Sequence, residues 1–529
     1  MKRNKLNSIN ILVAAGVLFG TVGLLCFSCA TNTAASKSKG EQKMVLSKNL
    51  WKKITTANPV SSNVFCADPT SVEYEGRLYV YGTNDHEQYL KAQKNSYEKI
   101  KSLVCFSTDD MVNWTYHGEI NVGKIAPWIY NSWAPAICSR VEDDGLTHFY
   151  LYFSNNGTGV GVITATSPLG PWSDPLKRPL IKQGMKGLED SPDPFDPGVV
   201  IDDNGDGWLS FGAGIGKTGT KAMPGSSKIV KLGKDMISFA SDFIPVKTPY
   251  HFEASELNFI NGTYIYTYNN NWEERSEWSD VIKTVTSKNA PVPPRCSMAY
   301  LTSKNPLDSS SWEYQNYYFK NPGEMGFEYS NNHTHLHKFM GKWYLLYHTL
   351  VLQEKAGTHG GFRSLCIDEI EVDEEKVIIH EGTGTRKGVN AIKNLNPFEK
   401  VAGTTMFTSA DVWYSDITNP QKIAATAKEA GAWIFVKNVD FGEGAKTFTA
   451  EVKGSGNLEV RTDGGKKVIA FLSPVLSEQA AQPSLSKTQT DDGFYEVTVE
   501  LAENLTGLHD LVFAFSNKGM ALKSWKFGH

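Results

Sequence analysis

The sequence predicts an all-β protein, a five-bladed β-propeller followed by a β-sandwich of jelly-roll type. A strand-turn-strand unit recurs five times between about Val45 and Ile379, with no convincing amphipathic helix except one turn between Gln88 and Lys101. The pattern breaks near Gly382 to Pro397, where Gly, Thr, Arg and Asn are enriched. Beyond this break, alternating strands separated by turns continue to the C-terminus, as in a sandwich.

The clearest copy of the repeat runs from His251 to Asn270. Its apolar residues alternate up to Asn261-Gly262, a dipeptide typical of a two-residue hairpin turn. Beyond the turn, tyrosines return with period two from Tyr264 to Tyr268. Glu253 is therefore expected at one end of a strand.

The other copies share a register with this one. They begin at Cys66, Ser132, Phe195 and Asn332. One position, eight or nine residues before the turn glycine, is occupied by Asp68, Asp196, Glu253 and His333. Ala134 takes that place in the second copy. Units spaced by roughly 60 to 80 residues are typical of propeller blades, whose first strands line the axis. Ionisable residues at one position of those strands are expected to converge on one funnel.

Three acids in one register predict chemistry. Asp68, Asp196 and Glu253 would repel one another on a common axis unless they are protonated, bound to metal or in use. Hydrolysis of a glycosidic bond needs an acid that protonates the leaving oxygen and a carboxylate that activates water or attacks directly. A third acid can raise the pKa of the acid that protonates the leaving oxygen. Taken singly, each acid could instead be a turn or strand-end cap. Glu256 lies an odd number of residues from Glu253, so a regular strand turns it to the other face.

Two segments imitate metal sites. Asp202 to Gly207 resembles the start of an EF-hand loop, but Ala213 stands where the closing glutamate belongs, which favours a hairpin turn. His333, His335 and His337 alternate on one strand and could share a face suited to a metal. Without a paired Cys or a second His cluster, a transition-metal site is the less favoured interpretation.

Composition excludes some functions. The chain has 529 residues and a net charge of -4, which fits two folded domains and gives no basic field for nucleic acid. The many aromatic residues offer flat faces for sugar rings, although strand-rich cores account for most of them. Beyond the N-terminal segment, the cysteines are dispersed without CxxC spacing, which indicates buried free thiols.

The N-terminus reads as a targeting signal. Basic residues precede an apolar run from Ile11 to Phe27, which is short for a membrane-spanning helix. The run is followed directly by Ser28-Cys29. This ending resembles a bacterial lipobox. We expect a signal peptide over 1–29, lipid attachment at Cys29 and a flexible tether over 30–44. Because no acidic run follows Cys29, the periplasmic side of the bacterial envelope is favoured over the cell surface. A soluble exported protein is the alternative.

Several motifs identify a family resemblance. CADPT, SWAP, FDPGVVIDDNG, FEAS with NGTYIYTY, NHTHLHKFMGKWYLLYH and GGFRSLCIDEIEVDE resemble glycoside hydrolase family 43 in order and spacing, from about residue 55 to 385. The resemblance implies an inverting enzyme on a five-bladed propeller, here residues 45–385. It implies Asp68 as general base, Asp196 as the acid that tunes the pKa and orients, and Glu253 as general acid.

The same resemblance implies further site residues. His333 matches a histidine deep in the central channel, near a calcium ion or water, so that a structural calcium is an expectation while no cofactor is required. Arg363 matches an arginine that contacts the acids or the sugar. Trp133 matches an aromatic wall of the sugar subsite.

The C-terminal part resembles carbohydrate-binding module family 6. After a linker over 386–396, residues 397–529 carry GAWIFVKNVDFGEGAKTF, TGLHDLVFAF and LKSWKF. Val401 to Met406 replaces the usual glutamate pair, and Ser473 to Asp492 lacks the usual stacking tryptophan. Both sugar binding and a purely structural role remain open for this part.

Together these features predict a monomeric, exo-acting glycosidase that removes terminal α-L-arabinofuranosyl or β-D-xylosyl units. The expected partners are plant cell-wall polysaccharides or oligosaccharides such as arabinoxylan, arabinan and xylan. A β-xylosidase acting on xylo-oligosaccharides is one alternative, and a non-catalytic glycan-binding lipoprotein is another. Five-bladed fructan hydrolases are a weaker alternative, because Asp68 lacks their Asn-Asp-Pro-Asn context.

Overall fold

The computed structural model describes residues 44–191, 193–212, 226–279, 290–474 and 485–529. Strands and turns make up nearly all of these residues, so the predicted all-β class is confirmed. The α-helices of the described chain are α1 (Asp85–Lys91) and α2 (Val122–Ile125). Helix α1 begins before the turn expected from Gln88, because the Asn84 side chain caps it by accepting from the Glu87 N–H at 3.1 Å.

The predicted signal peptide over 1–29 lies outside the described residues, as do its lipidation site Cys29 and the tether up to residue 43. From residue 44 onwards, none of the helices described is long and apolar enough to cross a membrane. The described cysteines are all buried and free, as predicted: Cys66, Cys105, Cys138, Cys296 and Cys366.

Five antiparallel sheets follow one another along the described part of the chain up to Glu369. The first contains β1 (Ala67–Tyr74), β2 (Arg77–Thr83), β3 (Leu103–Thr108) and β4 (Trp114–Ile120), and the second β5 (Trp133–Val141), β6 (Thr147–Ser154), β7 (Gly159–Ala165) and β8 (Ile181–Lys182). The third contains β9 (Gly198–Ile201), β10 (Gly207–Phe211), β11 (Ser227–Lys231) and β12 (Ile244–Val246). The fourth contains β13 (His251–Ile260), β14 (Thr263–Asn270), β15 (Met298–Ser303) and β16 (Glu313–Phe319). The fifth contains β17 (Thr334–Phe339), β18 (Lys342–Thr349) and β19 (Ser364–Glu369), and the short hairpin of β20 (Val372–Asp373) and β21 (Ile378–Ile379) follows.

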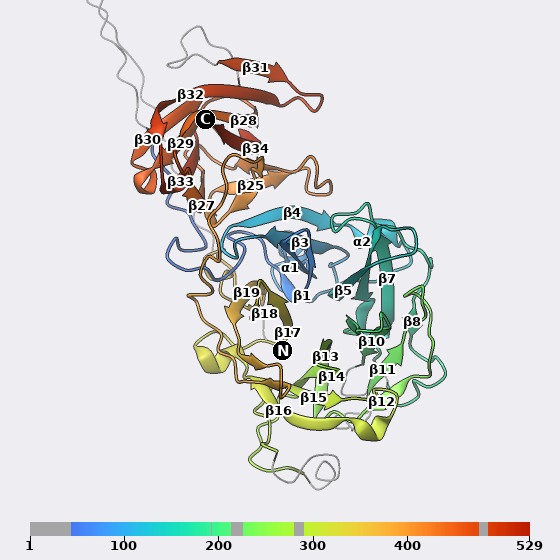
Figure 1. Cartoon of the computed structure of the whole chain (residues 1–529). Helices are drawn as coiled ribbons and strands as arrows, with labels where there is room; N and C mark the ends of the chain where they lie inside the picture. Colours follow the sequence, from blue (N-terminus) through green and yellow to red (C-terminus); the bar gives the residue numbers. More distant parts are fainter. Residues whose placement is uncertain (1–43, 192, 213–225, 280–289, 475–484) are drawn as a thin grey trace, which may run out of the picture. The chain divides into compact units, whose positions relative to one another are not determined.

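The first strands of these sheets form a closed ring. Strand β1 lies against β5, β5 against β9, β9 against β13, β13 against β17, and β17 against β1 again. In Figure 1 the labels β1, β5, β13 and β17 surround a common centre. The N-terminal ends of the five strands therefore face one another, which brings together residues far apart in sequence.

The predicted hairpin turn at Asn261-Gly262 is confirmed. Both residues have positive φ, 47° and 71°, as a type I′ turn requires. The same pair of positive φ angles occurs in the first and fifth sheets, at Glu75-Gly76 and Met340-Gly341. These turns fix the register of the first strand in each sheet.

Bulges interrupt the first strands where they reach the centre of the ring. Register shifts occur near the start of β1, β5 and β13. Left-handed φ angles accompany them at Asp68 (49°), Ala134 (36°) and Ala254 (63°), and Asp196 has the same conformation (51°) just before β9. A bulge redirects a side chain out of the regular alternation of a strand. It also stores backbone strain of the kind found at functional sites.

Two further sheets follow residue 400 in the described chain. One has the order β25-β26-β34-β28-β32-β31 with β22 on β34, and the other has the order β24-β27-β33-β29-β30. Their strands are β22 (Val401–Ala402), β24 (Thr408–Ala410), β25 (Val412–Ser415), β26 (Ala424–Ala427), β27 (Trp433–Asp440), β28 (Ala445–Lys453), β29 (Leu458–Thr462), β30 (Lys467–Leu472), β31 (Ser486–Gln489), β32 (Tyr495–Leu505), β33 (Leu508–Phe515) and β34 (Ala521–Gly528). Phe448 and Trp525 from one sheet share a buried cluster with Val460 and Phe513 from the other.

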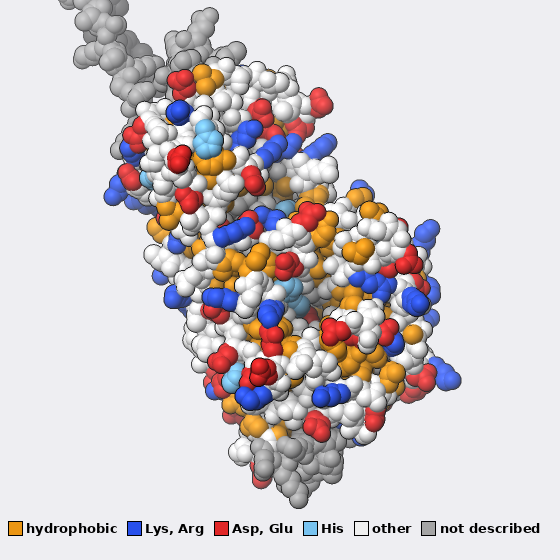
Figure 2. Space-filling view, in the orientation of Figure 1, with side chains coloured by type: hydrophobic (Ala, Val, Ile, Leu, Met, Phe, Trp, Pro, Cys, Tyr) orange, Lys and Arg blue, Asp and Glu red, His pale blue; other side chains and the backbone are white. Residues whose placement is uncertain are grey.

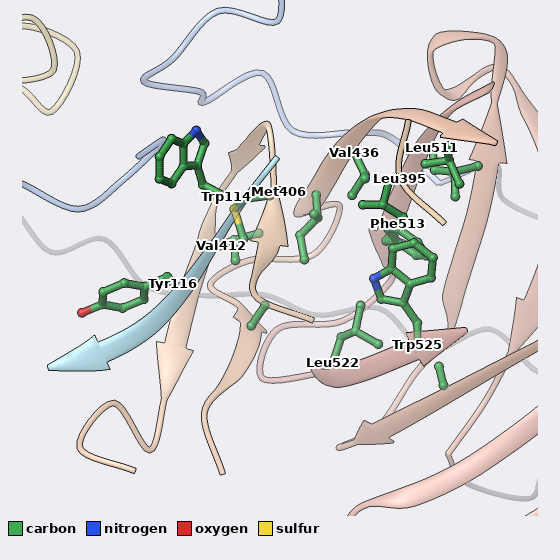
Figure 3. Close-up of a cluster of buried hydrophobic side chains, with 14 of the residues drawn as sticks. Trp114, Tyr116, Leu395, Met406, Val412, Val436, Leu511, Phe513, Leu522 and Trp525 are labelled. Atoms are coloured by element: carbon green, nitrogen blue, oxygen red, sulfur yellow. The ribbon is translucent and has the colours of Figure 1, made fainter. Parts of the chain in front are cut away.

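This C-terminal part is joined to the first sheet of the ring. Strand β23 (Thr405–Met406) pairs with β4, so a strand of the C-terminal segment extends the first sheet. The Asn113 side chain forms two hydrogen bonds with the backbone of Lys437. Its Nδ2 donates to the Lys437 carbonyl at 2.8 Å, and its Oδ1 accepts from the Lys437 N–H at 2.9 Å. Figure 3 shows Trp114 and Met406 in the hydrophobic cluster that continues towards Trp525. The first sheet and the C-terminal sheets therefore share one core.

Charged side chains of both signs are interspersed on the face drawn in Figure 2. This mixture agrees with the small net charge of -4. On the described atoms of that face, no extended basic patch gathers of the kind that binds a polyanion.

Candidate active site

A pocket of about 140 Å³ opens where the first strands converge, and we call it the ring-mouth pocket. It is lined by Asp68, Tyr97, Trp133, Ala134, Phe195, Asp196, Glu253, Asn331, His333 and Arg363. The structure thus brings together all six catalytic and substrate-binding residues predicted from the sequence. Its volume is well below the roughly 300–1,000 Å³ of pockets for drug-sized ligands. It suits one small ring rather than a long chain.

Asp68 is held as an anion. Its Oδ1 accepts from Arg363 Nη1 at 2.8 Å, and its Oδ2 accepts from the Thr83 hydroxyl at 2.7 Å. Burial alone would raise the pKa of Asp68, but the Arg363 guanidinium and the nearby His333 ring hold it well below its usual range. With its pKa lowered in this way, the Asp68 carboxylate stays ionised at neutral pH.

Arg363 is itself fixed by Asp85. Its Nε and Nη2 donate to the two carboxylate oxygens of Asp85 at 2.9 and 2.8 Å, in a bidentate pair. The guanidinium also lies 5.0 Å from the centre of the Tyr97 ring. Because both carboxylates are buried, the guanidinium is shared between Asp85 and Asp68, and it cannot rotate away from Asp85 without leaving a buried carboxylate without its cation.

Two histidines beside Asp68 carry different charges. Burial lowers the pKa of His348 to about 3, so its ring is neutral. The Asp68 N–H donates to His348 Nδ1 at 3.2 Å, which leaves the proton on Nε2 for the Asn331 carbonyl at 2.9 Å. For His333, burial would lower the pKa, but Asp68, 3.5 Å from its Nδ1, and the Asp196 carboxyl raise it to about 9. His333 is thus a cation at neutral pH.

Asp196 and Glu253 have pKa values shifted in the opposite direction to Asp68. Burial is the main cause for both, and each carboxylate also feels the charge of a neighbouring acid, which raises its pKa further. Asp196 accepts from the Ala254 N–H at 2.9 Å and from the Ser154 hydroxyl at 3.2 Å. Glu253 accepts from the Asn331 side chain at 3.1 Å. Glu253 has fewer partners, and it keeps its proton to higher pH than an ordinary glutamic acid.

Trp133 forms part of the pocket lining. Its indole N–H donates to the Tyr97 carbonyl at 3.1 Å, and the two rings meet edge to face with centroids 6.1 Å apart. Tyr97 comes from the loop before β3 and has a left-handed φ of 63°. An aromatic wall held in this way presents a fixed apolar face to a ligand.

Sequence reasoning missed several residues of the site: Asp85, Tyr97, Phe195 and Asn331. Asp85 follows the second strand of the first sheet, and Tyr97 lies in a loop, so neither occupies the repeated register. Asn331 directly precedes one predicted copy and Phe195 begins another, so the residues flanking the register position were the available signal.

Glu256 lies outside the pocket, but not for the reason expected. The parity argument assumed a regular strand, whereas β13 has register shifts on both sides of Glu253. Glu256 is buried and accepts from His335 Nδ1 at 3.1 Å, while His335 Nε2 accepts from the Ser71 N–H at 3.2 Å. The backbone N–H can only donate, which fixes the ring proton on Nδ1, facing Glu256. Of the alternating histidines, His333 alone lines the pocket.

The described side chains do not fit a directly bound metal. Within the described ranges, no group of three His, Cys, Asp or Glu side chains is arranged to hold one. Calcium prefers oxygen ligands, whereas His333 is protonated and lies beside the Arg363 cation. A calcium ion held near His333 through water therefore stays a prediction. The Asp202 segment is a hairpin turn, in which Oδ1 accepts from the Asn204 and Asp206 N–H groups at 2.9 and 3.0 Å.

Comparison with known proteins gives the family. The model of glycosyl hydrolases family 43 matches residues 56–378. The chain belongs to this family. It is 32% identical over 503 residues to an arabinoxylan arabinofuranohydrolase of Paenibacillus polymyxa, covering 89% of this chain and 74% of that protein. It is also 32% identical over 500 residues to an arabinoxylan arabinofuranohydrolase of Bacillus subtilis, covering 89% of this chain and 92% of that protein.

A solved structure extends the match beyond the family model. It is the crystal structure of a glycoside hydrolase family 43 arabinoxylan arabinofuranohydrolase from Bacillus subtilis in complex with cellotetraose. The TM-score is 0.78 at 30% identity, covering 90% of this chain and 98% of that one. Family 43 membership and these relatives make the chain a glycoside hydrolase.

Proposed function

We propose that this glycosidase is an exo-acting, inverting α-L-arabinofuranosidase that removes terminal arabinofuranosyl units from arabinoxylan. The observation that carries the proposal is the ring-mouth pocket, where one carboxyl is held ionised and another is held protonated within a space of about 140 Å³. Relatives named arabinoxylan arabinofuranohydrolase, 32% identical over most of the chain, support the sugar and the polymer.

We propose Asp68 as the general base. Its low pKa keeps it ionised, and its hydrogen bonds to Arg363 and Thr83 fix the orientation of its oxygens. In an inverting glycosidase the base activates water on one face of the sugar, with the two catalytic carboxyls about 6.5–9.5 Å apart. Asp68 takes a proton from a water molecule while the oxygen of that water attacks the anomeric carbon. Before the reaction, the cations His333 and Arg363 stabilise the buried negative charge of Asp68.

Glu253 is the proposed general acid. It carries the proton that the leaving oxygen requires, since burial and the neighbouring Asp196 raise its pKa. Protonation of that oxygen lets the glycosidic bond break as the bond to water forms. After the reaction Asp68 holds a proton and Glu253 has lost one, and exchange with solvent restores both.

Asp196 is the proposed acid that orients the general acid, and Trp133 is the proposed aromatic wall of the sugar subsite. Asp196 is anchored by the Ala254 N–H, so it keeps a fixed distance from the strand that carries Glu253. Trp133 is anchored on Tyr97 and offers a flat face to the sugar ring.

We propose a five-bladed β-propeller over 45–385, a linker over 386–396 and a β-sandwich over 397–529 that resembles carbohydrate-binding module family 6. The closed cycle of contacts among β1, β5, β9, β13 and β17 supports the propeller. The two C-terminal sheets with a common cluster support the sandwich. The shared core with β4 favours a packing role for this part.

We also propose that the protein acts as a monomer, exported and anchored through lipid on Cys29, with the periplasmic side favoured. The motif ending at Cys29 supports this. A Cys29→Ala variant that stayed in the membrane fraction of the native host would contradict the anchor.

The test of the activity uses paired nitrophenyl glycosides and the stereochemistry of the first product. We expect faster hydrolysis of the α-L-arabinofuranoside than of the β-D-xyloside, and release of the inverted anomer in proton NMR spectra recorded before mutarotation. Faster hydrolysis of the xyloside would favour the β-xylosidase alternative. A first product with retained configuration would rule out the proposed role of Asp68.

A further inference from the structure

A second pocket, of about 280 Å³, lies where α1 and the segment before β1 meet the start of the C-terminal sheets. We call it the junction pocket. Its aromatic lining consists of Trp51, His86, Tyr89, Tyr116, Trp413 and Tyr414. None of these six residues lines the ring-mouth pocket. Among the described residues, the junction pocket is thus an aromatic-lined pocket separate from the ring-mouth pocket, and the three acids line the ring-mouth pocket.

The aromatic lining forms a continuous arc. Trp51 and Tyr89 have centroids 6.3 Å apart, Tyr89 and His86 5.5 Å, and His86 and Trp413 6.2 Å. Trp413 is 45% exposed, although a tryptophan face is among the most costly surfaces to leave in water. Tyr116, also in the lining, packs on Tyr414 with centroids 4.7 Å apart. The arc therefore offers fixed, flat faces to a ligand of ring shape.

One polar atom in this pocket lacks a partner. His86 Nδ1 is buried and has no hydrogen bond to any described residue. The backbone of His86 is held, since its N–H donates to the Phe65 carbonyl at 3.2 Å. Burial lowers the pKa of the ring to about 4, so it is neutral and has one donor and one acceptor nitrogen. A hydroxyl can donate to or accept from such a ring, and an orphaned buried nitrogen beside an open pocket favours a ligand that supplies one.

Charges in the lining balance. Both carboxylate oxygens of Asp411 already accept hydrogen bonds, from Ser47 Oγ and Asn49 Nδ2, each at 2.6 Å. Lys428 is the lining cation among the described residues. One acid and one base give no excess charge that would select a phosphate or an acidic ligand. A neutral ligand with hydroxyl groups and an apolar ring face fits these features best.

We propose that the junction pocket binds sugar units of a neutral polysaccharide main chain, as a second carbohydrate site apart from the ring-mouth pocket. The choice of xylan as that polysaccharide rests on the proposed function. Helix α1 connects the two sites, because its Asp85 holds Arg363 in one while His86 and Tyr89 line the other. A substrate held in the junction pocket stays close to the enzyme while side-chain sugars enter the ring-mouth pocket.

The binding test uses the full chain with Glu253→Gln to stop hydrolysis, and xylotetraose as the probe in isothermal titration calorimetry. Adding Trp413→Ala is expected to weaken binding about tenfold, the loss expected for one aromatic platform. His86→Phe keeps a flat ring but removes both nitrogens, so it is expected to weaken binding less. Leu508→Ala, at a residue 55% exposed on β33 and outside both pockets, is the control that should leave affinity unchanged. Thermal unfolding checks that each variant is folded.

The activity test separates this inference from the proposed function. In the active enzyme, Trp413→Ala should lower kcat/KM on arabinoxylan several-fold and leave kcat/KM on nitrophenyl arabinofuranoside unchanged. If the aryl glycoside is hydrolysed but neither Trp413→Ala nor His86→Phe changes binding or polymer hydrolysis, the junction pocket is no sugar site and the proposed function stands. If neither aryl glycoside is hydrolysed while xylotetraose binding still depends on Trp413, the pocket stands and the proposed function fails.

Discussion

The ring of first strands and the C-terminal sheets are both antiparallel, yet they use their inner faces differently. At the centre of the ring, left-handed residues such as Asp68 and Asp196 bear ionisable side chains that point into a pocket. In the C-terminal sheets the inner faces meet in an apolar cluster around Phe513 and Trp525. Strained residues with ionisable side chains thus line the pocket proposed for chemistry, whereas the inner faces of the C-terminal sheets supply an apolar core that also holds the neighbouring first sheet.

The largest effect on rate is expected at the base. Asp68→Ala removes the group proposed to activate water, and we expect kcat to fall by about 10²- to 10⁴-fold on every substrate, whatever its leaving group. Initial rates on aryl and oligosaccharide substrates measure this. Asp202→Asn changes an equally buried aspartate of a hairpin turn and should leave kcat nearly unchanged. Equal losses in both variants would show that burial of an aspartate, and not its place in the ring, explains the effect.

The next effect is selective. Glu253→Ala should reduce hydrolysis of arabinoxylo-oligosaccharides by about 10²-fold or more, because their leaving groups need a proton, and should spare activated aryl glycosides. Comparing kcat on the two substrate types measures it. Glu256→Gln is the matched control, since Glu256 faces His335 outside the pocket. The acid is misassigned if Glu256→Gln reproduces the selective loss.

A smaller effect concerns pH. The proposed general acid must be protonated, so we expect activity to be lost as pH rises through the raised pKa of Glu253. The negative charge of Asp196 contributes to that raised value, so Asp196→Asn should lower the pKa and move the alkaline limb of kcat/KM to lower pH. On the acid side, the depressed pKa of Asp68 keeps the base ionised until strongly acidic pH. An alkaline limb that stayed in place in Asp196→Asn would argue against Glu253 as the group that titrates.

The smallest effect on rate is expected in the C-terminal core. Phe513→Ala opens a cavity at a fully buried site and should cost about 3–5 kcal/mol of unfolding free energy. The kcat of the folded enzyme on small aryl substrates should not change. Denaturant unfolding and initial rates below the transition test the two statements, with Leu508→Ala as the exposed control. If kcat fell in proportion to the unfolding free energy, the C-terminal core would contribute to catalysis as well as to stability, contrary to this prediction.

How much the sequence predicts depends on repetition. Asp68, Asp196, Glu253 and His333 could be predicted because five copies of one unit align them, and the ring then brings them together. Asp85 and Tyr97 could not, because Asp85 holds Arg363 from helix α1 and Tyr97 reaches the pocket from a loop, and neither occupies the repeated register. The bulges were also invisible, since left-handed geometry at Ala134 and Ala254 comes from tertiary packing rather than from residue preference.

The pairing of Asp68 with Arg363 has a consequence for biosynthesis. The two residues are 295 positions apart, and their contact bridges the first and last sheets of the ring. A ribosome releases Asp68 long before Arg363, so during synthesis the carboxyl lacks the cation that later depresses its pKa. If Asp68 is the base, as proposed, the nascent chain has no competent base until the fifth sheet of the ring docks. Onset of hydrolytic activity is therefore expected only after the fifth sheet has been synthesised, and a chain that stops before residue 363 should be inert even if its first four sheets have formed.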